Sequence, residues 1–135
     1  MVGYGGRGIK VGTASFNSKL TIANNFVSGV NVSNFSSFTN SSSFGIGIGM
    51  IGGSGTISTL ANGINLYHNT VNMYGNYAYP TSCITAAIYI GTPNASGLDM
   101  RDNIFVNSMN NTDPSATASK NYAIYDAVTT APFTT

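Results

Sequence analysis

The only histidine of the chain, His68, lies in the segment LYHNTVNM and is followed directly by Asn69. The equivalent position before an asparagine is occupied by Asn24 in ANNFVSG and by Asp102 in RDNIFVN. If these segments stack as neighbouring strands, the side chain of His68 lies about 5 Å from that of Asp102. A carboxylate at this distance fixes the tautomer of an imidazole and raises its basicity. The spacing therefore predicts a general acid–base pair.

The alternative is that His68 and Asp102 are corner residues that face solvent, because Asn, Asp and His all tolerate the left-handed backbone of tight turns. We favour this interpretation. Cys83 could act as a nucleophile with His68 as its base if the loop at 75–82 folded back on the histidine. Otherwise Cys83 is a small buried side chain, which is the more common environment of a free cysteine.

Aromatic and basic residues near the pair suggest a second kind of chemistry. Tyr67 and Arg101 directly precede the histidine and the aspartate. Tyr89 and Tyr125 fall at equivalent outward positions of two predicted strands, where their rings could stack on sugar rings. They could equally stabilise a sheet as a cross-strand pair. We treat these four residues as candidate ligand-binding residues, with a polysaccharide as the candidate ligand.

Composition argues against several other functions. The chain has five Lys and Arg residues and four acidic residues, too few for a basic surface that binds nucleic acid. It lacks the clusters that hold a metal ion and the acidic pairs of glycosidases. No apolar run approaches the roughly 18 residues of a membrane span. We therefore expect no metal, no cofactor, no nucleic acid and no membrane insertion.

The elements that must position these residues are short and repeated. Three segments share two alternating apolar residues, then two variable positions and an asparagine: LTIANNFVSG, INLYHNTVNM and LDMRDNIFVN. Their asparagines are Asn25, Asn69 and Asn103. Linkers rich in Ser, Thr, Asn and Pro separate these segments and are typical of loops. The repeat therefore indicates one structural unit per asparagine.

A second set of segments precedes the first and recurs with a similar period: GIKVGT, GIGIGM, AIYIGT and AIYDAV. Aligning them on their leading isoleucines pairs Ile9, Ile46, Ile88 and Ile124. In this alignment alternate residues, such as Ile46 and Ile48, point into the core. The outward column then contains Lys10, Gly47, Tyr89 and Tyr125.

Two markers with one period predict a solenoid whose coils stack as parallel sheets. The recurring asparagine at one corner of each coil would form a ladder that satisfies backbone groups left unpaired by the bend. We predict an all-β fold, a right-handed single-stranded parallel β-helix of about three and a half coils. Residues 1–135 would form a single β-helix domain.

The segments ANNFVSG, YHNTVNM and RDNIFVN resemble the β-helix repeats of pectate-lyase-like proteins and of large secreted surface proteins common in Bacteroidetes. The resemblance spans residues 7–128. It implies an exported bacterial protein at the cell surface or outside the cell, of which this chain is a fragment or a relative. The chain itself contains no predicted signal peptide. Lyases that share this fold carry calcium-binding acids beside a basic residue, and only Lys10 here is basic in the corresponding column.

Three functions are compatible with these features. The first, which we favour, is a structural or adhesive module that forms homo-oligomers through its open ends or a glycine-rich face. The second is a small metal-independent hydrolase or carbohydrate-active enzyme that uses His68 with Asp102. The third is a non-catalytic module that binds polysaccharide.

Overall fold

The computed structural model describes residues 5–12, 20–31, 44–50, 63–78, 83–91, 97–116 and 119–127, and the statements below concern these residues. They form ten strands: β1 (Arg7–Val11), β2 (Leu20–Ala23), β3 (Phe26–Ser28), β4 (Gly45–Met50), β5 (Ile64–Tyr67), β6 (Thr70–Tyr77), β7 (Ile84–Ile90), β8 (Leu98–Arg101), β9 (Ile104–Asn111) and β10 (Lys120–Asp126).

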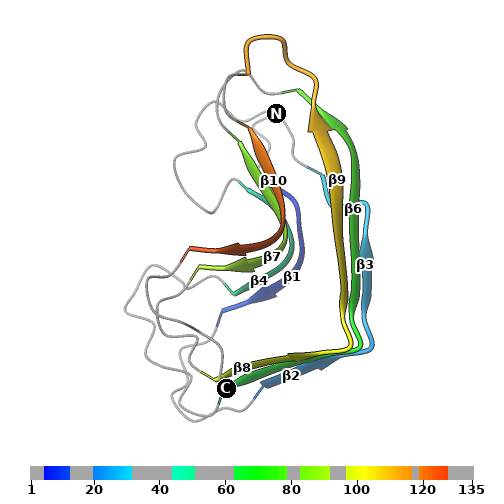
Figure 1. Ribbon diagram of the computed structural model, residues 1–135, viewed down its shortest axis with the longest axis vertical. Helices are drawn as coiled ribbons and strands as arrows, with labels where there is room; N and C mark the ends of the chain where they lie inside the picture. Colours follow the sequence, from blue (N-terminus) through cyan, green and yellow to red (C-terminus); the bar gives the residue numbers. More distant parts are fainter. Residues whose placement is uncertain are drawn as a thin grey trace.

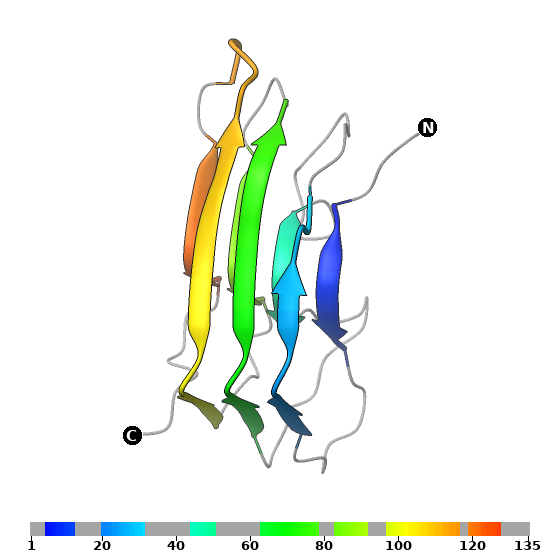
Figure 2. The ribbon, with the colours of Figure 1, turned by 90° about the vertical axis from the view of Figure 1, so that its right-hand side faces the viewer.

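The strands form three parallel sheets that wind around one core. The first sheet has the order β1-β4-β7-β10, the second β2-β5-β8 and the third β3-β6-β9. The chain passes through the three sheets in turn, so that each passage forms one coil (Figure 1). Figures 1 and 2 together show a right-handed coil. The fold is therefore the predicted parallel β-helix, with three coils and the first strand of a fourth.

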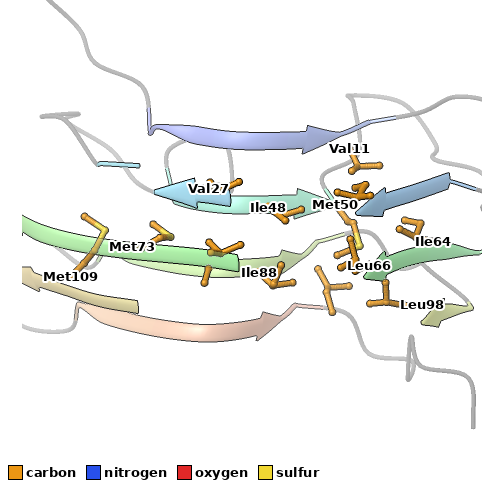
Figure 3. Packing of buried hydrophobic residues seen from close by; sticks show 14 of the residues in the cluster. Val11, Val27, Ile48, Met50, Ile64, Leu66, Met73, Ile88, Leu98 and Met109 are labelled. Atoms are coloured by element: carbon orange, nitrogen blue, oxygen red, sulfur yellow. The ribbon is translucent and has the colours of Figure 1, made fainter. Parts of the chain in front are cut away.

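Alternation along the strands places apolar side chains inside the coil, where equivalent residues stack in columns (Figure 3). Leu66 stacks between Ile22 and Met100 in the second sheet. Val71 lies between Val27 and Phe105 in the third sheet. The members from the central coil are fully buried. No single coil could exclude water from this core, so the stack is the folding unit.

The first sheet bends sharply along its strands, as Figure 1 shows. At the bend, two successive residues of β4 face the core: Gly47 approaches Val71, and Ile48 belongs to the main apolar cluster. Ile46 instead joins a separate cluster with Phe44, Ala86 and Tyr89 on the other face of the sheet. The expectation that Ile46 points inward is therefore wrong, because the bend interrupts the two-residue alternation.

The alignment of the first sheet also differs from the predicted one. Ile9 and Ile88 both pair with Ile48 rather than with Ile46. The outward column is accordingly Lys10, Gly49, Tyr89 and Tyr125, with Gly49 in the place expected for Gly47. In addition, every residue of β4 is buried. Its glycines therefore do not present the open flat face that the sequence suggested.

The third sheet is longer than its sequence suggests. The residues Gly75–Tyr77, part of the expected loop at 75–82, and Met109–Asn111, the start of an expected linker rich in Ser, Thr, Asn and Pro, extend β6 and β9. They pair with one another along their whole length. The remainder of the expected loop, 79–82, lies outside the described residues.

Candidate functional site

The corner between the second and third sheets has the same backbone conformation in all three coils. Asn24, His68 and Asp102 have φ angles of 59°, 53° and 53°, in the left-handed region. The amide of His68 donates to the carbonyl of Arg101 at 3.1 Å, and that of Asn24 to the carbonyl of Tyr67 at 3.1 Å. Residues that tolerate positive φ are thus required here whatever their chemistry.

The next position carries the asparagine ladder. The Nδ2 of Asn25 donates to Oδ1 of Asn69 at 3.0 Å, and the Nδ2 of Asn69 donates to Oδ1 of Asn103 at 3.0 Å. The same oxygens accept the backbone amides of Asn25 and Asn69 at 3.2 and 2.8 Å. The Nδ2 of Asn69 also donates to the carbonyl of Ile22, and that of Asn103 to the carbonyl of Leu66. The ladder therefore satisfies the backbone groups that the corner would leave unpaired.

The structure brings His68 and Asp102 together, as the stacking predicts. The imidazole Nδ1 lies 3.9 Å from Oδ2 of Asp102. Both side chains are largely exposed, at 61% and 73%. Water therefore screens the electrostatic attraction between the two side chains. The geometry permits a weak ion pair when the imidazole is protonated, and both side chains are open to solvent.

A polar cluster on the outer face of the second sheet adjoins this pair. Asp99 accepts a hydrogen bond from the Tyr67 hydroxyl at 2.7 Å and one from Nε of Arg101 at 2.8 Å. The guanidinium of Arg101 lies over the Tyr67 ring, 5.8 Å from its centroid. The bond to Asp99 raises the pKa of the Tyr67 hydroxyl. Tyr67 and Arg101, predicted separately as ligand-binding residues, are thus held together by Asp99, which the sequence reading did not select.

The structure does not bring Cys83 and His68 together. Cys83 is buried and contacts the hydroxyl of Tyr77, the last residue of β6, whereas His68 precedes the first residue of that strand. The eight residues of β6 therefore place Cys83 and His68 roughly 25 Å apart. Burial raises the pKa of the Cys83 thiol to about 11, although the hydrogen bond with Tyr77 acts in the opposite direction. Its surroundings are those of a structural cysteine and not of a nucleophile.

The two candidate tyrosines of the first sheet pack against other aromatic rings. The ring of Tyr89 lies 5.5 Å from that of Tyr125 and 5.8 Å from that of Phe44. Tyr125 in turn stacks on Tyr122 at 4.8 Å. Because Tyr89 is only 6% exposed, its ring has little surface to offer to a sugar. This arrangement agrees with the alternative in which Tyr89 and Tyr125 stabilise the sheet as a cross-strand pair.

Sequence reading missed a second polar network, which links the first and third sheets across β6, β7, β9 and β10. Nδ2 of Asn107 donates to Oγ1 of Thr85 at 2.9 Å. Oδ1 of Asn121 accepts hydrogen bonds from the hydroxyls of Thr85 at 2.7 Å and Tyr77 at 3.2 Å. Asn107 takes the place that Met73 occupies one coil earlier. A polar residue at a position where the preceding coil has an apolar one was the feature of the sequence that could have indicated this network.

Among the residues that the structure describes, no group of three or more His, Cys, Asp or Glu side chains could hold a metal ion. The same residues contain no helix long and apolar enough to cross a membrane. No protein-family model matches the chain, and the comparisons with curated proteins and with solved structures find no match either. The fold and the corner define a parallel β-helix with an asparagine ladder.

Proposed function

We propose that the chain is a structural or adhesive β-helix module that assembles with further copies of itself through the exposed apolar residues of the last described coil. This proposal groups it with the repeats of exported bacterial surface proteins that its turn segments resemble. It assigns no catalytic role to the corner.

The observation that carries the proposal is the exposure of core residues at the last coil. Ile48 and Ile88 are fully buried, whereas Ile124, next in the same column, is 42% exposed. Met100 and Phe105 are likewise only half-buried, although the residues before them in the same columns, Leu66 and Val71, are fully buried. An apolar layer beside a strand edge favours association with another β structure.

The experiment is light scattering over a series of protein concentrations. The proposal predicts concentration-dependent assembly that Ile124→Lys weakens, because the lysine introduces a charge into the contact. Thr21→Lys is the matched control, since it places the same charge on an exposed outward position of the second sheet. An assembly that is insensitive to Ile124→Lys would contradict stacking through this end.

A second candidate function, hydrolysis, has one supporting observation, the 3.9 Å contact between His68 and Asp102. It predicts turnover in a panel of ester, phosphoester and glycoside substrates, lost in His68→Asn. Asparagine preserves the left-handed backbone of the corner, so that this variant tests chemistry separately from folding. Absence of turnover in the wild type would leave the structural proposal as the better one.

A further inference from the structure

The outer face of the third sheet carries most of the exposed large apolar side chains in the described part of the chain. Phe26 is 71% exposed, Ile104 59%, Tyr74 53% and Val106 43%. They come from β3, β6 and β9, which lie side by side toward the viewer in Figure 2. This is a single surface, formed by neighbouring strands in register.

The register arranges these residues in rows across the sheet. One row is Phe26–Thr70–Ile104, and the next is Ser28–Asn72–Val106. Each row therefore has a small polar residue on the central strand β6. The larger apolar residues of these rows lie on β3 and β9, the two outer strands.

The three strands contain no charged residue at all: their sequences are FVS, TVNMYGNY and IFVNSMNN. A charged partner would gain no ion pair on this face and would lose hydration of its own charges. An uncharged partner loses nothing in this way. The lack of charge thus favours a neutral, partly apolar sheet surface as the partner, and a second copy of the same face offers such a surface.

The rows also match themselves under a two-fold rotation about an axis along β6. When this axis lies midway between the two copies and runs parallel to β6, the rotation places the β3 of one copy over the β9 of the other. It also places β6 over β6. Phe26 then meets Ile104 of the second copy, and Thr70 meets Thr70. Contacts of this reciprocal kind define an isologous dimer, and two sheets that pack face to face lie about 10 Å apart.

We propose that the outer face of the third sheet pairs with the same face of a second copy, forming a two-sheet sandwich. The inference rests on the proposed assembly role but names a surface other than the end of the stack. Three strands of up to eight residues present roughly 300 to 400 Å². Stable interfaces bury about 800 Å² per partner. The dimer is therefore weak and forms reversibly as concentration rises.

A charge exchange tests the predicted contact. Phe26→Lys or Ile104→Asp alone should weaken dimerisation at least about tenfold, measured by sedimentation equilibrium, because each puts an unpaired charge into the interface. The double variant Phe26→Lys/Ile104→Asp should restore the dimer, since each lysine then faces an aspartate of the other copy. Both side chains are exposed, so the variants should fold as the wild type does.

The remaining outcomes are decisive as well. A dimer lost in Ile124→Lys but unaffected by Phe26→Lys would support stacking through the end and overturn the face-to-face dimer. A double variant that stays monomeric would overturn the two-fold contact. A wild type that is monomeric throughout the series, yet sediments with insoluble polysaccharide unless Phe26 is replaced, would show that a glycan occupies this face.

Discussion

At the scale of single residues, Asn69 connects more of the molecule than any catalytic candidate does. It is fully buried, and its side chain joins Asn25, Asn103 and the carbonyl of Ile22 across three coils. A buried amide of this kind is favourable only while all its partners are present. Asn69 therefore contributes to stability as part of a complete network and not through one hydrogen bond.

We predict that Asn69→Ala lowers the free energy of unfolding by about 3 kcal/mol or more, because it leaves several backbone and side-chain groups without partners at about 1–3 kcal/mol each. Urea denaturation measures the loss. Asn65→Ala is the matched control, since Asn65 only donates an exposed hydrogen bond to Thr21. It should cost about 0.5 kcal/mol or less. Equal costs would contradict a structural role for the ladder.

Cys83 predicts a dependence of stability on pH. Its thiol ionises near pH 11 in the folded state and near its ordinary value of 9 when exposed. Between these values unfolding releases a proton, so that the free energy of unfolding falls as the pH rises from about 9 to 11. Melting temperatures of wild type and Cys83→Ala should converge over this range if burial of the thiol is the cause. A difference in melting temperature that stays constant across this pH range would exclude burial of the thiol as the cause.

At the scale of the element, the bend of the first sheet depends on close approach to the third sheet. A Cβ atom added at Gly47 would collide with Cγ1 of Val71 and lie 2.6 Å from the carbonyl oxygen of Ala87. Gly8 meets Val27 in the same way one coil earlier. Small residues at this position therefore allow the sheet to bend inward.

Gly47→Ala should cost about 2 kcal/mol through overpacking. If the collision with Val71 contributes, Gly47→Ala/Val71→Ala should be less destabilised than the sum of the single variants, as a double-mutant cycle in urea would show. Additive costs would mean that the bend does not depend on this contact.

The fold itself could be predicted because two markers, the asparagines and the paired isoleucines, recur with one period. The register of the first sheet could not. Ile46 and Ile48 both fit an alternating pattern, and a shift of two residues leaves the alternation unchanged. The tertiary structure separates them: Gly47 packs closely against Val71, and Ile48 lies in the main apolar cluster.

The corner was partly predictable from the sequence. The neighbouring positions of His68 and Asp102 follow directly from the ladder register. The contact of Asp99 with Tyr67 does not, because it depends on side-chain rotamers across two strands. The sequence places Asn107 at a position where the preceding coil has Met73, but it does not identify its partner Thr85, because that contact depends on the approach between two sheets.

At the scale of the whole molecule, burial decreases from the central coil toward the last one. Leu66 and Met100 occupy one column, yet Leu66 is fully buried and Met100 only half-buried. At concentrations where the protein is monomeric, Leu66→Ala should cost about 3 kcal/mol and Met100→Ala about 1 kcal/mol in urea denaturation. Similar costs at both positions would mean that the last coil is covered in the monomer.

The parallel pairing has a mechanical consequence. The hydrogen bonds between coils, including those from Asn25 to Asn69 and from Asn69 to Asn103, point along the axis of the stack. A pulling force along that axis passes through all the layers of bonds in series, so the layers break one after another, beginning with an outermost coil. Each separation releases the 34 to 44 residues between successive asparagines as slack chain. Under tension the molecule would lengthen in steps and dissipate the load, unlike a rigid rod.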